Sequence, residues 1–441
     1  MFDLSSNRRT RARHKAGAHW QGMLVDGAAI TAWAVVLLVM ARWVAQLALE
    51  RLNQRHVRAH AEAVPEAFRD TVDAGTYRKS VAYTLAGSRF HLVEATWQAA
   101  VLLGVLFSGL LPWGYAKAAA WSGSSEWGMA AFILAVGLLL ATVNLPLDWH
   151  HQFRLEERFG FNTTTPKLWW LDRLKGLLLS VGLGLPLLWL VLKLVGWTGR
   201  WWWLWAWAAV LAFQLLMAVL APVLILPLFN KFTPLPEGPL RQRLLQLAER
   251  TRFRARSIQV MDGSKRSRHA NAFFTGFGRF RKIVLFDTLL QQLAEPELEA
   301  VLAHEIGHYK KKHIPKMLGF SAVASLAAFF AIATLAQQEW FYRAFGFEPG
   351  HIAPALLLFG LTAGLVTFWF SPVAHYWSRR HEYQADAFAA ATMGEAAALI
   401  RALRKLSEKN LSNLTPHPLY SGFYYSHPTL LEREQALQPA S

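Results

Sequence analysis

Apolar runs of membrane-spanning length recur along this chain and restrict its fold more than any other feature. An α-helix needs about 20 apolar residues to cross about 30 Å of hydrocarbon, and 54% of all residues here are hydrophobic. Seven runs reach or approach that length: Gly27–Leu49, Trp97–Ala116, Trp127–Leu147, Gly176–Trp197, Trp201–Phe229, Met317–Ala336 and Ile352–Phe370. We therefore expect a mainly α-helical, multi-pass membrane protein with about seven transmembrane helices.

Positive charge is concentrated in alternate connections between these runs, and the formal net charge is +17. The positive-inside rule places such connections in the cytoplasm. They are Arg51–Arg89, Arg154–Lys175, Lys231–Lys316 and the tail from Arg379. The basic stretch "RRTRARHK", residues 8–15, conflicts with this topology. Seven crossings place the two termini on opposite sides of the membrane, so a cytoplasmic C-terminus leaves this stretch on the non-cytoplasmic side. No nucleic-acid recognition motif accompanies the charge, so we expect the lipid bilayer as a partner and no nucleic acid.

The connection between the fifth and sixth runs has the composition of a water-soluble domain. It contains a Pro- and Gly-rich linker, "TPLPEGPL", an amphipathic helix in "RQRLLQLAERTRF", and strand patterns at "SIQVMDG", "NAFFTGF" and "RKIVLFD". We divide the chain into residues 1–229 with five transmembrane helices, a catalytic α+β segment 230–314, residues 315–377 with helices six and seven, and a C-terminal catalytic segment 378–441.

The stretch "VLAHEIGHYKKKH" contains the pattern H-E-x-x-H at His304, Glu305 and His308. Residues four apart lie on one face of a helix, so both imidazoles can reach one metal ion while the glutamate faces the adjacent water. The chain has no cysteine, so zinc would be held by His, Asp or Glu. The alternative is an amphipathic helix with two surface histidines.

A hydrolytic zinc site needs a third protein ligand and one open position. The second polar concentration is "AHYWSRRHEYQAD", where His375, Arg379, Glu382 and Asp386 follow at steps of four, three and four. All four therefore share one helical stripe. We assign Glu382 as the third ligand and Asp386 as the carboxylate that orients a ligand histidine. His375 and His381 remain rival ligands, and an exposed charged helix face remains an alternative.

These stretches together resemble the Ste24 group of the M48 zinc metallopeptidases, the CAAX prenyl protease 1 family. The likeness covers most of the chain after about Leu140. It is carried by "EERFGFNTTTPKLWWLDRLK", "LPLFNKFTPLPEG", "HANAFFTGFG", "AVLAHEIGHYKKKH", "SRRHEYQADAFA" and "YYSHPTLLERE". The resemblance implies seven helices around a hydrated chamber, a small α+β metallopeptidase domain of the gluzincin type with one zinc per chain, and cleavage near the C-terminus of a farnesylated CAAX substrate.

The resemblance also implies roles for individual residues. It implies zinc ligands at His304, His308 and Glu382, a catalytic base at Glu305, a ligand-orienting carboxylate at Asp386, a substrate-pairing strand at Asn271 and Ala272, and a contact to the scissile carbonyl or the developing oxyanion from His427 and Arg433.

The residues predict a mechanism without a covalent intermediate. Zinc lowers the pKa of bound water from about 15.7 toward 7 and polarises the scissile carbonyl. Glu305 takes the proton and later delivers it to the departing amine. An extended peptide could add to the "NAFFTGF" strand through backbone hydrogen bonds. For that strand a plain edge, and for His427 a surface helix cap, are the alternatives.

Other functions remain open from the sequence alone. A site-2-type intramembrane metalloprotease would carry H-E-x-x-H inside an apolar run, whereas "EPELE" and "KKKH" flank it here. A shorter M48 relative of the heat-shock membrane type, or a seven-span receptor or transporter, is a further alternative. In a bacterial inner membrane the substrates could be misfolded membrane proteins without prenyl groups. In a eukaryote the expected location is the endoplasmic reticulum membrane.

Overall fold

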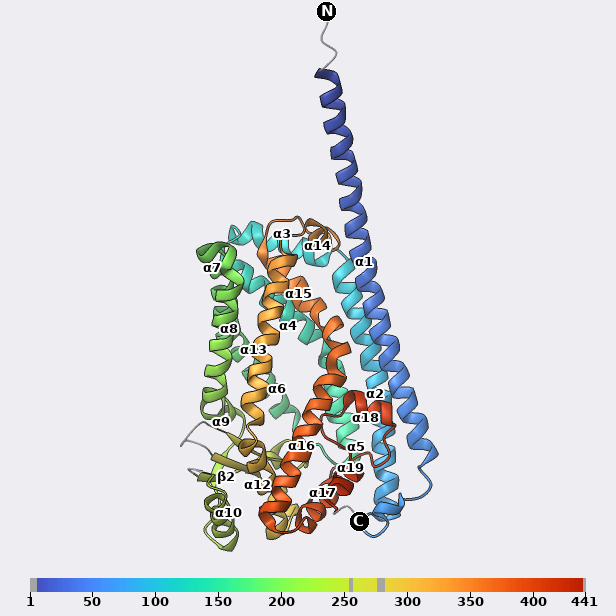
Figure 1. The fold of residues 1–441 in the computed structure, drawn as a ribbon, viewed down its shortest axis with the longest axis vertical. Helices are drawn as coiled ribbons and strands as arrows, with labels where there is room; N and C mark the ends of the chain where they lie inside the picture. The colour runs from blue at the N-terminus through green and yellow to red at the C-terminus, as the bar shows by residue number, and fades with distance from the viewer. Residues whose placement is uncertain (1–5, 254–256, 276–281, 439–441) are drawn as a thin grey trace, which may run out of the picture.

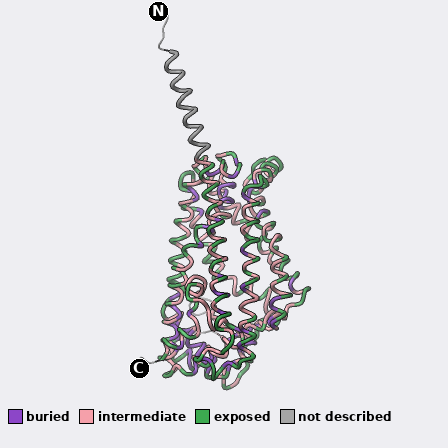
Figure 2. Tube along the Cα trace, turned by 90° about the vertical axis from the view of Figure 1, so that its right-hand side faces the viewer, coloured by how far each residue is buried: buried purple, intermediate pink, exposed green. Residues whose placement is uncertain are grey.

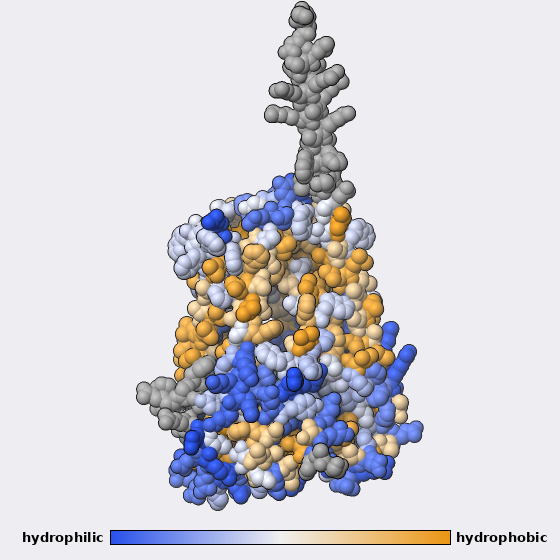
Figure 3. Space-filling model, in the orientation of Figure 1, coloured by the Kyte–Doolittle hydropathy of each residue, from blue (hydrophilic) through white to orange (hydrophobic). Residues whose placement is uncertain are grey.

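The computed structural model describes residues 6–253, 257–275 and 282–438, with side chains described from Gly27 onward. Long helices lie along the longest axis, and the sheet and a group of shorter helices lie at one end (Figure 1). Figure 3 shows hydrophobic surface over the long helices and hydrophilic surface over the end that holds the sheet. This division fits a bilayer-spanning chain with a hydrated domain at one face. The basic side chains of residues 8–15 lie outside the described residues.

Six helices in the described ranges are long and apolar enough to cross a membrane: Gly27–Ala59, Ala74–Phe107, Glu126–Phe159, Pro166–Phe229, His313–Leu335 and Ile352–Met393. The fourth has 64 residues, about three times the length that the hydrocarbon requires. It folds back at Gly199, where φ is 53°. Its arms α7 (Leu185–Thr198) and α8 (Trp202–Leu220) pack against each other. The chain therefore makes seven crossings, as the apolar runs predict.

The second crossing differs from its predicted bounds. Helix α2 spans Ala74–Phe107, and α3 (Leu110–Ser122) follows a break at Gly109, where φ is 79°. The predicted run Trp97–Ala116 is therefore wrong, since it joins parts of two helices. Charged and polar residues lower the mean hydropathy of the first half of α2, so the sequence did not indicate a membrane helix there. Two of them contact the carboxylate of Glu50, which is 5% exposed, on helix α1 (Ser6–Ala59): Ser88, which is buried, and His91, whose side chain is half exposed.

The last crossing continues beyond its predicted end at Phe370. Helix α15 (Ile352–Thr367) leads through a 3-10 turn into α16 (Ser371–Met393). The combined helix has 42 residues, which is about 63 Å of helix against about 30 Å of hydrocarbon. The lower half of α16 therefore extends out of the bilayer and reaches helix α12 (Glu295–Lys310), against which it packs.

A mixed four-stranded sheet organises the hydrated domain, with strand order β1-β2-β4-β3. Strands β2 (Ser257–Met261) and β4 (Lys282–Phe286) are parallel, and β1 (Phe232–Pro234) and β3 (Ala272–Thr275) add antiparallel edges. The sequence predicted β2, β3 and β4 but missed β1, which lies in the Pro-rich linker.

Helices α10 (Pro239–Arg250) and α12 bury apolar side chains against this sheet. Leu244 and Leu247 of α10 are 0% and 1% exposed, and Ile306 of α12 is 0% exposed. Each such side chain stabilises the fold by about 1.5–3 kcal/mol. Buried residues gather at this end of the molecule, whereas the long helices are mostly intermediate or exposed (Figure 2). The core thus fixes the position of α12 relative to the sheet.

The remaining helices complete the frame. They are α4 (Glu126–His150), α5 (Glu157–Phe159), α6 (Pro166–Leu179), α9 (Leu226–Phe229), α11 (Asp287–Gln292), α13 (His313–Leu335), α14 (Glu339–Arg343), α17 (Ala397–Lys409), α18 (Pro418–Tyr424) and α19 (Leu430–Leu437).

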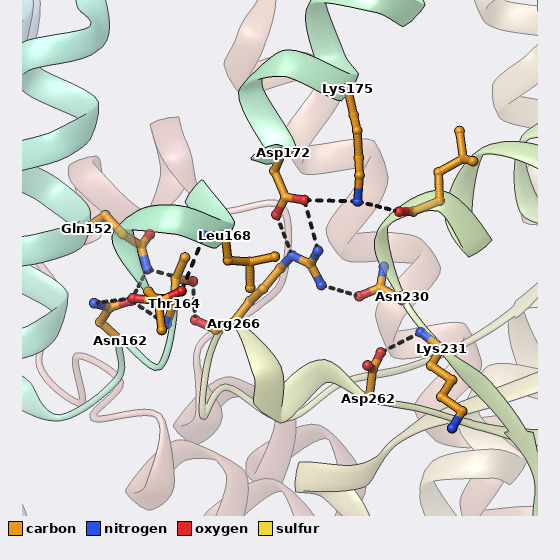
Figure 4. A network of polar contacts seen from close by, with 12 residues as sticks. Gln152, Asn162, Thr164, Leu168, Asp172, Lys175, Asn230, Lys231, Asp262 and Arg266 are labelled. Carbon is orange, nitrogen blue, oxygen red and sulfur yellow. Dashed lines mark hydrogen bonds and ion pairs between the residues drawn. The ribbon is translucent and has the colours of Figure 1, made fainter. Parts of the chain in front are cut away.

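A polar network joins the membrane helices to the segment that precedes β3 (Figure 4). Arg266 donates two hydrogen bonds to Asp172 of α6, at 2.8 and 3.0 Å, and a third to Asn230, at 3.1 Å. The hydroxyl of Thr164 donates to the carbonyl of Arg266 at 3.0 Å. Bidentate Arg–carboxylate pairs fix orientation as well as distance. The network therefore holds the start of β3 in a defined place relative to the bilayer.

Candidate metal centre

Three potential metal ligands converge where α12 meets α16. One ligand atom from each of His304, His308 and Glu382 lies within 4.8 Å of the others. The Nε2 atoms of the two histidines are 3.1 Å apart, and they lie 3.5 and 3.3 Å from the carboxylate oxygens of Glu382. Two imidazoles and one carboxylate form a donor set typical of catalytic zinc.

The carboxylate of Glu382 gives a second indication that these residues fit a cation. Its Oε2 atom is buried and makes no hydrogen bond of acceptable geometry, although Nδ1 of His427 lies 2.9 Å away. A buried carboxylate oxygen without a partner is costly, and a bound cation would satisfy it. The residues present therefore fit a metal ion.

The rival ligands lie elsewhere. His375 places Nδ1 2.6 Å from the carbonyl oxygen of Phe423. His381 stacks on His313, with ring centroids 4.0 Å apart. Neither belongs to the metal-ligating group found in the described chain.

Asp386 lies behind His304, on the side away from the convergence point. Its Oδ1 atom is 2.8 Å from Nδ1 of His304. Arg433 of α19 donates Nε and Nη2 to Asp386 at 2.8 and 2.5 Å, and the aspartate is only 1% exposed. A ligand histidine in zinc enzymes commonly donates its second ring nitrogen to such a carboxylate. Arg433 compensates the buried negative charge.

These contacts determine the protonation of His304. Burial lowers the pKa of this histidine, but the hydrogen bond to Asp386 and the nearby carboxylate of Glu382 raise it, and the result is a pKa of about 9. Without a metal, the imidazole is therefore protonated at neutral pH. A metal ion must displace that proton from Nε2.

Glu305 and His427 line the same cavity as His304 and Glu382. The cavity has a volume of about 680 Å³, and its walls include Glu305, His427, Asn271 and Ala272. Burial raises the pKa of the Glu305 carboxyl, which moves it toward the range suited to a general base. The side chain of His427 is 65% exposed. The cavity lining thus contains seven of the residues selected for the site, namely His304, Glu305, Glu382, Asn271, Ala272, His427 and Arg433. His308 and Asp386 are not part of the lining, and both contact His304.

The polar residues on one face of α16 contribute to the metal centre and also support the segment that carries His427. Glu382 is a proposed ligand and Asp386 contacts His304, as described above. One turn earlier, Arg379 donates to the carbonyl oxygens of Gly422 and Tyr425, at 3.3 and 2.6 Å. These bonds fix the segment between α18 and α19 that carries His427. The sequence detected the stripe by its spacing but gave no sign of this contact, because its partners are about forty residues away.

Helices α12 and α16 pack closely against each other at Gly307. A Cβ atom at this position would lie 3.0 Å from Cα and 3.1 Å from the carbonyl oxygen of Ala385. Because both contacts are to backbone, the helices must separate to accept a side chain. Gly307 therefore permits the interhelical distance that the ligands require.

We expect Gly307→Ala to weaken the metal centre. Overpacking should lower the free energy of unfolding by about 1–3 kcal/mol, and the separation should move Glu382 away from the histidines and lower zinc affinity. Thermal melting with and without zinc measures both effects. Gly319→Ala in α13 is the control, because a Cβ there meets nothing within 4 Å. Equal zinc affinity in the two variants would contradict the expected role of Gly307.

The fold and the site together define an integral-membrane metallopeptidase. A family described as "CAAX prenyl protease N-terminal, five membrane helices" matches residues 53–231, and "Peptidase family M48" matches residues 234–441. The chain belongs to the Ste24 group of peptidase family M48. It is a multi-pass membrane metalloendopeptidase of a zinc-dependent family, whose substrates are peptides.

Relatives and a solved structure agree with this assignment. CAAX prenyl protease 1 of Saccharomyces cerevisiae is 36% identical over 435 residues, covering 92% of this chain and 95% of the relative. A homolog of that protease from Arabidopsis thaliana is 37% identical over 388 residues, covering 85% and 90%. The crystal structure of S. mikatae Ste24p matches with a TM-score of 0.84 at 35% identity, covering 92% of this chain and 99% of that one.

The family assignment decides between the alternatives. It favours an M48 protease over a site-2-type protease, a receptor or a transporter. The position of the H-E-x-x-H motif agrees, because α12 lies outside the six candidate membrane helices.

Proposed function

We propose that this protein hydrolyses peptide bonds near the C-terminus of prenylated CAAX-type polypeptides, with one zinc ion per chain held by His304, His308 and Glu382. The observation that carries the proposal is the convergence of these three ligands beside a cavity that also contains Glu305. The substrate class is supported by the similar proteins from yeast and plants, which are CAAX prenyl proteases.

Each residue at the site has its own role in the proposed reaction. Bound zinc would acidify a water and polarise the scissile carbonyl. Glu305 accepts the proton of the attacking water and transfers it to the departing amine. Asp386 accepts a hydrogen bond from Nδ1 of His304 and so keeps Nε2 free for the metal. His427 faces the cavity from its loop and would donate a hydrogen bond to the developing oxyanion. Arg433 also lines this cavity, and we assign its positive charge a role in stabilising the developing oxyanion.

Strand β3 supports a mode of substrate binding. It forms an edge of the sheet, and the amide of Phe286 donates to the carbonyl of Asn271 at 3.1 Å. Successive residues of an antiparallel pair alternate in direction, so Ala272 and Phe274 direct their backbone polar groups to the free edge. The side chain of Asn271 accepts a hydrogen bond from the Ala272 amide at 2.8 Å. A substrate carbonyl would take the place of that side-chain oxygen.

The proposal includes the orientation of the protein in the membrane and the membrane in which it lies. The basic connections and tail support a cytoplasmic location for the catalytic segments 230–314 and 378–441. The membrane would be the endoplasmic reticulum in a eukaryote or the inner membrane in a bacterium. Nucleic acid has no part in the proposed activity.

A farnesylated CAAX peptide tests the substrate class. We expect the purified, zinc-loaded protein to release the last three residues, because Ala272 of β3, which would pair with an extended substrate, lines the same cavity as Glu305. Mass spectrometry of the products identifies the bond that is cleaved, and the same peptide without the farnesyl group is the control. Cleavage of unrelated peptides with the farnesylated peptide left intact would contradict the proposed substrate and favour a broader role in membrane-protein quality control.

A further inference from the structure

The two ligand histidines have different partners at the ring nitrogen that faces away from the metal position. Nδ1 of His304 contacts the carboxylate of Asp386, as described above. Nδ1 of His308 instead lies 3.0 Å from Nδ1 of His313. His313 is 1% exposed. A second imidazole thus occupies the place behind His308 that a carboxylate occupies behind His304.

The hydrogen-bonding pattern assigns the protons of this pair. Nε2 of His308 must be unprotonated to hold a metal, so the single proton of the neutral ring lies on Nδ1. A bond between two Nδ1 atoms needs one donor and one acceptor, so His313 accepts there and carries its own proton on Nε2. That Nε2 lies 2.9 Å from Oε1 of Gln384, an acceptor. The chain of donors and acceptors is therefore consistent from the metal position to Gln384.

The contact depends on a break between helices. In a continuous helix, His313 would lie about 140° around the axis from His308 and could not face it. Helix α12 ends at Lys310, and Lys312 adopts the left-handed conformation with φ of 57° before α13 begins at His313. The ring of His313 then stacks on His381 of α16, with an interplanar angle of 14°. The corner and the stacking together fix the ring.

We propose that His313 is a positioning residue for the metal centre. It accepts the Nδ1 proton of His308 and so holds His308 in the tautomer and orientation that present Nε2 to zinc. A neutral acceptor does this without adding another negative charge to a buried site that already contains Glu382 and Asp386. The inference rests on the proposed zinc site.

Zinc affinity tests the proposal without reference to turnover. His313→Phe keeps a ring that can stack on His381 but removes the acceptor. We expect its zinc affinity, measured by chelator competition, to fall by about 10–100-fold. The visible spectrum of the cobalt-substituted protein should change as well, because the orientation of a ligand imidazole changes. His381→Phe is the matched control, and we expect both its affinity and its cobalt spectrum to equal those of the parent.

The outcomes are distinguishable. Parental zinc affinity and cobalt spectrum in His313→Phe, or equal losses in His313→Phe and His381→Phe, would overturn the positioning role. A parent protein that binds no zinc would overturn the proposed function instead. If His313→Phe fails to fold, Gln384→Leu tests the same hydrogen-bond chain, because it removes the acceptor for Nε2 of His313. Gln384 is exposed, so we expect this variant to fold. A smaller loss of zinc affinity in that variant supports the proposal, and an unchanged affinity overturns it.

Discussion

Glu305→Gln should abolish turnover while zinc remains bound. Glutamine keeps the size of the side chain but cannot accept the proton of the attacking water. General-base catalysis contributes about 10²–10⁴-fold, so we expect kcat to fall toward the upper end of that range. The three ligands are unchanged, so the zinc content should stay at one per chain. Steady-state kinetics on a cleaved peptide, with metal analysis of the same sample, measure both quantities.

The matched control is Glu295→Gln in the first turn of the same helix. The side chain of Glu295 is 45% exposed, lies 3.9 Å from Arg243 and is not part of the cavity lining. We expect parental kcat in this variant. Turnover in Glu305→Gln equal to that in Glu295→Gln would show that another group acts as the base.

Glu382→Gln should remove the metal itself. The substitution replaces an anionic ligand with a neutral amide while leaving both imidazoles in place. Loss of a partner that only supports a ligand commonly costs 10–100-fold in metal affinity, so loss of a ligand should cost more than about 100-fold. We expect no stoichiometric zinc after purification and no turnover, with partial recovery at high zinc concentration. Metal analysis and chelator competition measure the effect.

Glu395→Gln, just beyond the end of α16, is the control for this variant. Glu395 is exposed and lies outside the cavity lining. Both variants remove one negative charge, so a loss of zinc binding that comes only from the change in net charge would appear in both. Stoichiometric zinc in Glu382→Gln would mean that the third ligand is a different residue.

Regular periodicity accounts for what the sequence could predict. Seven crossings follow from apolar length, and the strands β2, β3 and β4 follow from short apolar patterns. The stripe of α16 was visible because helical spacing places Glu382 and Asp386 on one face. The first half of α2 was hidden because its charged and polar residues lower the local hydropathy, among them Ser88 and His91, which contact Glu50 of α1. Strand β1 was hidden by the proline in "FTP".

Contacts across helix breaks and long loops could not be predicted from periodicity. His313 follows His308 at a spacing that points away from it on a helix, and only the left-handed residue Lys312 brings the two together. The three lysines between the histidines gave no sign of this corner. Arg379 supports the segment before His427 through backbone carbonyls, which carry no side-chain signature. Such contacts require the folded chain.

In the sequence, the proposed ligands of the metal centre are separated by the last two membrane-spanning helices. His304 and His308 precede α13, whereas Glu382 follows α15. During synthesis, a growing polypeptide that has emerged only as far as α13 holds two imidazoles and no carboxylate to complete the set. If these three residues hold the metal, we expect proteolytic activity only after the last two membrane helices have been inserted. An incomplete chain would then not cleave neighbouring proteins in the bilayer.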